Sequence, residues 1–170
     1  KNAPGADDNA SGTSTNIEVF RVLMNQNFTP ETTIEIHAYG AEEIGLVGSG
    51  EIAEDYKKRN KKVVSMVQFD MNGYAKKVPK IHFVANGTNS KLTQQLAELV
   101  DYYLNIGSRS SFLLFGSSDH ASWKKRGFPV AFPTEDPFNF NKNIHTHKDT
   151  IDEINSPEQI KEFGKLGVAY

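Results

Sequence analysis

The chain of 170 residues contains no cysteine. Disulfide bonds, catalytic thiolates and cysteine-bound zinc are therefore excluded, and any metal ion must be held by histidine, aspartate or glutamate. No apolar run approaches the roughly 18–20 residues that cross a bilayer, so no membrane span is expected. No signal peptide is apparent either, because the opening residues 1–5 lack an apolar core. Mature secreted proteins lose such a peptide, so its absence leaves the location open.

The sequence also lacks a basic block, and its net charge is −2. Nucleic acid and anionic membranes are therefore not expected as partners. No internal repeat or low-complexity stretch divides the chain. Its length and its 38% hydrophobic content fit one globular domain over residues 1–170.

The pattern of apolar residues predicts strands that alternate with helices. Such alternation indicates an α/β fold with a mostly parallel central sheet and helices on both faces. In these sheets, active residues follow the carboxyl ends of the strands. The predicted helices cover residues 11–23, 49–60, 90–104, 118–125 and 157–170, the last capped by Ser156, and the predicted strands cover 33–39, 62–70, 81–84 and 128–132.

Four short motifs place acids or histidine where chemistry is expected. Taken singly, each has an ordinary interpretation: acids at a helix N-terminus, a solvated turn, a cap after a strand, and a surface histidine. Two of them follow the predicted strands that end near Tyr39 and at Asp70. The motifs are Gly5–Gly12 with Asp7 and Asp8, Ala41–Leu46 with Glu42 and Glu43, Phe69–Asn72 with Asp70, and Asn143–Thr150 with His145.

The four motifs together supply what a hydrolytic two-zinc site requires. Such a site needs oxygen and nitrogen ligands, a carboxylate that bridges the two ions, and a further carboxylate that stays free as a base. Glu42 and Glu43 offer a base and a ligand side by side, because neighbouring side chains on an irregular turn can diverge. Their joint occurrence therefore favours a metal-dependent hydrolase over four unrelated surface features.

These motifs, in this order, resemble the M28 family of zinc peptidases, and most of all the secreted bacterial leucyl aminopeptidases of the Vibrio type. The likeness extends from Ala3–Asp8 through Met71–Tyr74 and Ser118–Trp123 to Leu166–Tyr170. It implies a phosphorylase/hydrolase-like zinc exopeptidase fold whose N-terminal portion is missing from this chain. It also implies peptide substrates and a secreted or periplasmic location.

The resemblance implies a role for each motif. Asp8 bridges two Zn²⁺ ions, Glu43 and His145 complete one site, and Asp70 binds the second ion. Glu42 is the general base for a water molecule that the metals activate, and the Asp8–Asn9 peptide bond is cis. Ser118 orients Asp70. The pocket for a leucine-like first residue draws on Met71, Val84, Phe115, Phe138 and Ile144.

The sequence departs from the family pattern in several places. The upstream histidine of the second zinc site and the strands before it are missing, so the missing N-terminal segment is itself an expected partner. Leu113 and Ser117 stand where close relatives have cysteines, Phe115 replaces a tyrosine, and Thr134 replaces an aromatic residue. Two alternatives stay open: a glutaminyl-cyclase-like acyltransferase that holds one zinc with Asp8, Glu43 and His145, and a non-catalytic binding module.

Overall fold

The computed structural model of the chain describes residues 3–113 and 117–170, which form an α/β fold. The helices are α1 (Gly12–Asn25), α2 (Val47–Lys58), α3 (Ser90–Leu99), α4 (His120–Lys125) and α5 (Pro157–Ala169), with short helical segments η1 (Ala6–Ser11), η2 (Val100–Leu104) and η3 (Ile151–Glu153). The strands are β1 (Met66–Val67), β2 (Ile81–Val84), β3 (Ser108–Ser111), β4 (Val130–Ala131) and β5 (Pro133–Thr134).

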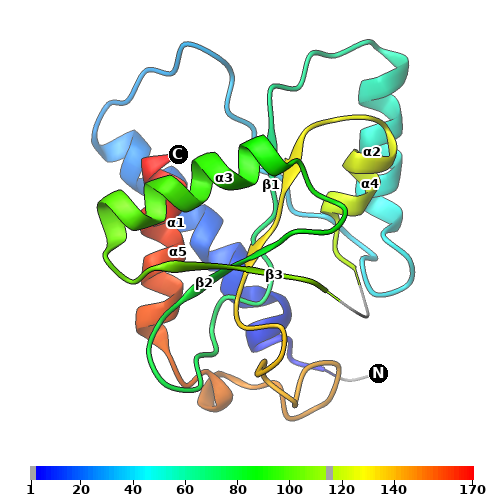
Figure 1. The fold of residues 1–170 in the computed structure, drawn as a ribbon. Coiled ribbons are helices and arrows are strands. Elements are labelled where there is room, and N and C mark those ends of the chain that lie inside the picture. The colour runs from blue at the N-terminus through cyan, green and yellow to red at the C-terminus, as the bar shows by residue number, and fades with distance from the viewer. Residues whose placement is uncertain (1–2, 114–116) are drawn as a thin grey trace.

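The strands form two small sheets, whereas one central sheet is predicted from the sequence. In the first, β1 runs parallel to β4, with Met66 opposite Val130. In the second, β2 lies between β3 and β5, parallel to the former and antiparallel to the latter. Helices α1 and α5 pack against each other on one side of the molecule, and α2 and α4 lie together on another (Figure 1). The α/β class is thus confirmed, with a more divided sheet than expected.

The main hydrophobic core lies between β2, α3 and α5. Phe83 of β2, Leu96 of α3 and Phe163 of α5 are each at most 1% exposed. The predicted apolar stripe on residues 90–104 is buried up to Val100, but Tyr103 is 60% exposed. The chain changes there to the wider turn of η2, in which each residue advances less around the axis, so the buried face rotates.

The predicted caps and boundaries of the helices hold within a few residues. Ser156 caps α5, because its hydroxyl accepts a hydrogen bond from the backbone N–H of Gln159 at 3.2 Å. None of the helices in the described part of the chain is both long and apolar enough to cross a membrane.

The prediction of a strand over residues 33–39 is wrong, because this segment does not pair with another strand among the described residues. This segment is not assigned to any sheet of the described residues, and Ile34 and Ile36 are 52% and 42% exposed. On α1, Val19 is buried while Ile17 and Phe20 are more than half exposed. Segment 33–39, one face of α1 and residues 61–70 border a cavity of about 1280 Å³. Alternation of polar and apolar residues shows that a chain can form a strand, but a strand also needs a neighbour for its N–H groups.

Candidate metal centre

Asp8, Glu43 and His145 converge from three loops. One ligand atom of each lies within 4.8 Å of the others. The Nε2 atom of His145 is 2.9 Å from Asp8 Oδ2 and 3.2 Å from Glu43 Oε2. The Asp8 side chain is only 13% exposed, whereas those of Glu43 and His145 are about half exposed. Asp8 is therefore the buried member of the group, and Glu43 and His145 lie nearer to solvent.

The loops that carry these side chains turn sharply. Ala41 and Leu46, on either side of the two glutamates, have φ values of 61° and 57°. Met71, directly after Asp70, and His145 itself also lie in this left-handed region, at 58° and 60°. L-residues rarely adopt this conformation, and such residues cluster at functional sites because the surrounding structure must hold them there. The left-handed turns thus direct the acids and the histidine to a common point.

Asn9 fixes the position of Asp8 relative to Asp70. Its Oδ1 accepts the backbone N–H of Gly12 at 3.0 Å and of Met71 at 3.3 Å, and its Nδ2 donates to the carbonyl of Phe69 at 3.0 Å. A Cβ on Gly12 would lie 2.2 Å from that carbonyl, so only glycine permits this close approach. The Asp8–Asn9 peptide bond is cis, as the resemblance implies.

Asp70 is buried beside this cluster. Its Oδ2 accepts a hydrogen bond from the Ser118 hydroxyl at 2.5 Å, which is the contact that the resemblance implies, whereas its Oδ1 has no hydrogen-bond partner among the described residues. Burial, together with the nearby negative charge of Asp8, raises the pKa of Asp70 to about 8. A buried carboxylate oxygen without a donor, next to another carboxylate, is suited to a cation.

Glu42 lies on the same cavity wall without belonging to the three-ligand group. Burial, together with the negative charges of Asp119, Glu43 and Asp8, raises its pKa to about 7. The five acids Asp8, Glu42, Glu43, Asp70 and Asp119 all line the cavity described above.

Asp119 is a site residue that the sequence does not reveal. It is 5% exposed, burial raises the pKa of its carboxyl, and its Oδ1 has no hydrogen-bond partner within the described residues. An aspartate immediately before a short helix is an ordinary helix-terminus residue. The only signal for it is its place next to Ser118 in the stretch Ser118–Trp123.

The donor set fits zinc. Carboxylate oxygens and an imidazole nitrogen are ordinary zinc ligands, and no other group of three such side chains is found within residues 3–113 and 117–170. Burial raises the pKa values of Asp8 and Asp70, and the neighbouring carboxylates raise them in the same direction, as expected where negative charges crowd together. Asp8, Glu43 and His145 are therefore the residues that would hold one ion, and Asp70 lies outside this group.

The residues expected to bind the substrate do not converge at one point, unlike Asp8, Glu43 and His145. Val84 is buried within β2 at 1% exposure, Phe138 is 59% exposed, and Met71 and Ile144 are half-buried. None of these four lines the large cavity, or a second cavity of about 370 Å³ that is bordered by residues such as Tyr74 and Asp136. Phe115 lies outside the described residues.

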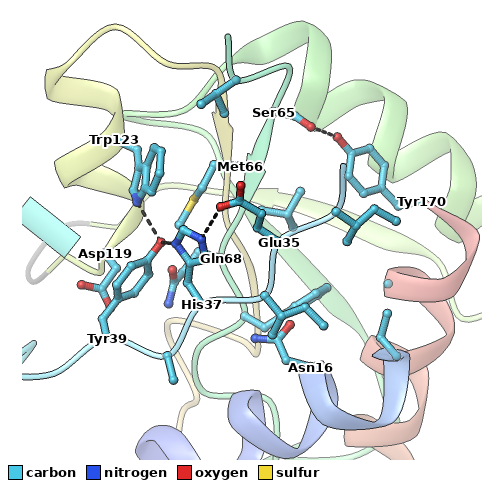
Figure 2. Close-up of a pocket in the computed structure, with 18 of the residues that line it drawn as sticks. Asn16, Glu35, His37, Tyr39, Ser65, Met66, Gln68, Asp119, Trp123 and Tyr170 are labelled. Carbon is cyan, nitrogen blue, oxygen red and sulfur yellow. Dashed lines mark hydrogen bonds and ion pairs between the residues drawn. The ribbon is translucent and has the colours of Figure 1, made fainter. Parts of the chain in front are cut away.

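Two further histidines, His37 and His82, lie in polar and aromatic surroundings. His82 is 6% exposed and its Nδ1 is 2.8 Å from the Ser111 hydroxyl. His37 lies on the wall of the large cavity, where its ring nitrogens contact Glu35 and Tyr39, and Tyr39 also accepts a hydrogen bond from Trp123 (Figure 2).

A family profile, related sequences and solved structures all indicate the same protein family for this chain. The profile of Peptidase family M28 matches residues 1–170. "Leucine aminopeptidase 1" of Ajellomyces dermatitidis is 35% identical over 99% of this chain and 47% of its own length. The structure of LapB from Legionella pneumophila is 34% identical, with a TM-score of 0.94 over 99% of this chain and 46% of that chain.

A zinc aminopeptidase from Bacillus subtilis, BSAP, is 28% identical to this chain. Its TM-score is 0.85 over 99% of this chain and 42% of that chain. The chain thus spans about half the length of the relatives that it matches.

Proposed function

Because this chain belongs to peptidase family M28, we propose that it is the metal-binding and catalytic portion of an aminopeptidase that hydrolyses the N-terminal peptide bond of peptides. The observation that carries the proposal is the convergence of Asp8, Glu43 and His145 within 4.8 Å of one another, with Glu42 on the same cavity wall. The names of the relatives, which are aminopeptidases, support the same activity.

The proposed cofactor is zinc, and the proposed number is two ions. Asp8 would bridge them, Glu43 and His145 would complete the first site, and Asp70 would hold the second. When bound, zinc supplies Lewis acidity, which polarises a carbonyl group and lowers the pKa of water. The unpartnered Oδ1 of buried Asp70 supports a second ion, since within the described residues no donor satisfies it.

Glu42 is the proposed general base and acid. It would accept a proton from the attacking water and later donate it to the leaving amine, so the C–N bond is broken and the peptide gains one water. The raised pKa of Glu42, about 7, brings its proton affinity near neutral pH, where proton transfer in both directions is most effective.

The substrate is proposed to bind by its free α-amino group, whose positive charge complements the acids that line the cavity, among them Asp8, Glu42 and Glu43. That interaction explains why cleavage would begin at N-termini. A leucine-like first residue is also proposed, on the names of the leucine aminopeptidase relatives.

One observation favours a second candidate function. The three side chains that the structure brings together are also sufficient for a glutaminyl-cyclase-like site with a single zinc, because Asp70 lies outside the group. A chromogenic leucine amide and a glutaminyl peptide, each incubated with the zinc-loaded protein, separate the candidates. We expect release of the leucine chromophore. Cyclisation of the glutaminyl peptide would favour the second candidate, and folded, zinc-loaded protein that turns over neither would favour a binding module.

The large cavity is proposed to be covered by a polypeptide segment outside residues 1–170, which the resemblance places upstream. Exposed Ile34 and Ile36 and the unpaired segment 33–39 support this proposal, because buried strands require hydrogen-bonding neighbours. A secreted or periplasmic location is likewise a proposal, and cell fractionation of the producing organism tests it.

A further inference from the structure

Asp149 is a fully buried acid that holds the backbone of the Asp8 loop. Its exposed fraction is 0%. Its Oδ1 accepts the backbone N–H of Asp7 at 3.0 Å and its Oδ2 accepts that of Asp8 at 3.1 Å. Its own carbonyl accepts the N–H of Ala6 at 3.1 Å. Three consecutive N–H groups of the segment that carries the central metal-ligating acid are therefore satisfied by one residue.

The same residue closes the loop that carries His145. The backbone N–H of Asp149 donates to the carbonyl of Thr146 at 3.3 Å, which forms a turn directly after the histidine. The side chain of Asn141 reaches Asp149 Oδ1 at 3.4 Å from the beginning of this loop. Asp149 thus connects the two segments that present Asp8 and His145.

We propose that Asp149 is a positioning residue that fixes the separation of Asp8 and His145 at the distance that the metal requires. This inference rests on the proposed metal site and adds a residue to it. Groups that orient metal ligands through hydrogen bonds strongly influence metal affinity. The hydrogen bonds from the N–H groups of Asp7 and Asp8 to the Asp149 carboxylate are called the clamp below. Since metal ligands must be held within a few tenths of an ångström, the clamp acts directly on the geometry of the site.

A carboxylate is required for this role. It presents two acceptor oxygens to the two N–H groups of Asp7 and Asp8, and charge makes these hydrogen bonds stronger than neutral ones. An asparagine at position 149 has nearly the same shape but only one oxygen, so its NH₂ group would face one of these N–H donors. The Asp149→Asn variant therefore loosens the clamp while it leaves the packing almost unchanged.

Asp136→Asn is the matched control. Asp136 is also an aspartate of this region that accepts two hydrogen bonds, from the N–H of Phe138 at 2.9 Å and from the side chain of Asn139 at 2.8 Å. Neither partner carries a proposed metal ligand. A general effect of removing a hydrogen-bonded carboxylate would appear in both variants, whereas an effect on the metal site would appear only at Asp149.

The test is the zinc dissociation constant, measured by chelator competition on the 170-residue chain and on both variants, with thermal unfolding of the zinc-free proteins alongside. We expect Asp149→Asn to bind zinc roughly 10–100-fold more weakly than wild type. Asp136→Asn should bind as wild type does. Wild-type affinity in a folded Asp149→Asn variant would overturn the positioning role and leave the proposed function intact. A wild-type chain that binds no zinc would overturn both.

Hydrogen exchange of the wild-type chain tests the inference without a variant, should Asp149→Asn not fold. Zinc should slow exchange of the backbone amides of Asp7, Asp8 and Asp149 together, because the clamp and the ion restrain the same two loops. Zinc-dependent protection that is absent from Asp7 and Asp8 would overturn the positioning role.

Discussion

His145 and Asp8 come from opposite ends of the chain, and their side chains meet with Nε2 and Oδ2 2.9 Å apart. The histidine loop reaches Asp8 because Asp149 binds the backbone on both sides of this contact. Glu43 contacts the same histidine nitrogen at 3.2 Å. Two acids and one imidazole directed at one point are the arrangement on which the proposed metal site depends.

The unequal placement of Asp8 and Asp70 predicts unequal loss of metal. Asp8→Ala should retain less zinc than Asp70→Ala, because Asp8 belongs to the three-ligand group and would bridge both ions, whereas Asp70 would serve one. The zinc content per chain after equilibrium dialysis measures the difference. Asp152→Ala, which removes an exposed aspartate, is the control and should keep the zinc content of wild type. Equal residual zinc in the Asp8 and Asp70 variants would contradict the bridging role.

The Ser118–Asp70 hydrogen bond predicts a loss of stability. Ser118→Ala removes the donor to Oδ2 of an acid whose Oδ1 already lacks a partner among the described residues. An unsatisfied buried acceptor costs about 1–3 kcal/mol of unfolding free energy. Urea unfolding of the zinc-free chain measures this loss of unfolding free energy. Ser117→Ala, which alters an exposed neighbouring serine, should have nearly the unfolding free energy of wild type. Equal stability of the two variants would show that Ser118 does not support Asp70.

Buried His120 predicts a stability change in mild acid. Burial lowers its pKa to about 4, from about 6.5 in an unfolded chain. Between these values the unfolded chain binds the proton and the folded chain does not. The stabilising effect of the neutral folded form is therefore complete above pH 6.5 and is lost as the pH falls towards 4, by an amount on the order of 3 kcal/mol.

His120→Gln cannot titrate and isolates this contribution. Unfolding free energies of wild type and variant, measured at intervals from pH 4 to pH 7.5, should diverge in slope below pH 6.5, with the steeper loss in wild type. Parallel curves would mean that His120 titrates equally in the folded and unfolded chain.

The uncovered cavity predicts fast exchange in the segment beside it. In the 170-residue chain, backbone amides of residues 33–39 should exchange rapidly, because these N–H groups have no strand partner among the described residues. In a longer chain that contains the region upstream of Lys1, the same amides should be protected. Strong protection in the 170-residue chain as a monomer would contradict the proposal that a further segment covers the cavity.

The sequence predicts the expected metal ligands better than the buried residues that surround them and hold them in place. Asp8, Glu43 and His145 lie in short motifs whose chemistry is local, so their residue types and order indicate the site. Asp149 and Asp119 are both buried in the structure, but in the sequence each is an ordinary loop or helix-end aspartate. Their roles arise from hydrogen bonds and charges across distant segments, which no local pattern records.

The fold shows the same division between local and distant information. The helices follow from apolar periodicity, and β2 follows from a short apolar run that is buried throughout. Segment 33–39 has the correct alternation for a strand, yet its pairing depends on a partner that its own residues cannot specify. The expected substrate residues come from resemblance alone, and Val84 is buried in β2 and does not line the large cavity.

The central claim is that Glu42 transfers the proton and does not hold the metal. The direct measurement is kcat on a leucine amide together with zinc content for Glu42→Gln, with Glu51→Gln, an exposed glutamate of α2, as control. Loss of a general base should lower kcat by about 10²–10⁴-fold while zinc content stays at the wild-type level. A near-normal kcat, or loss of zinc in step with activity, would contradict this role.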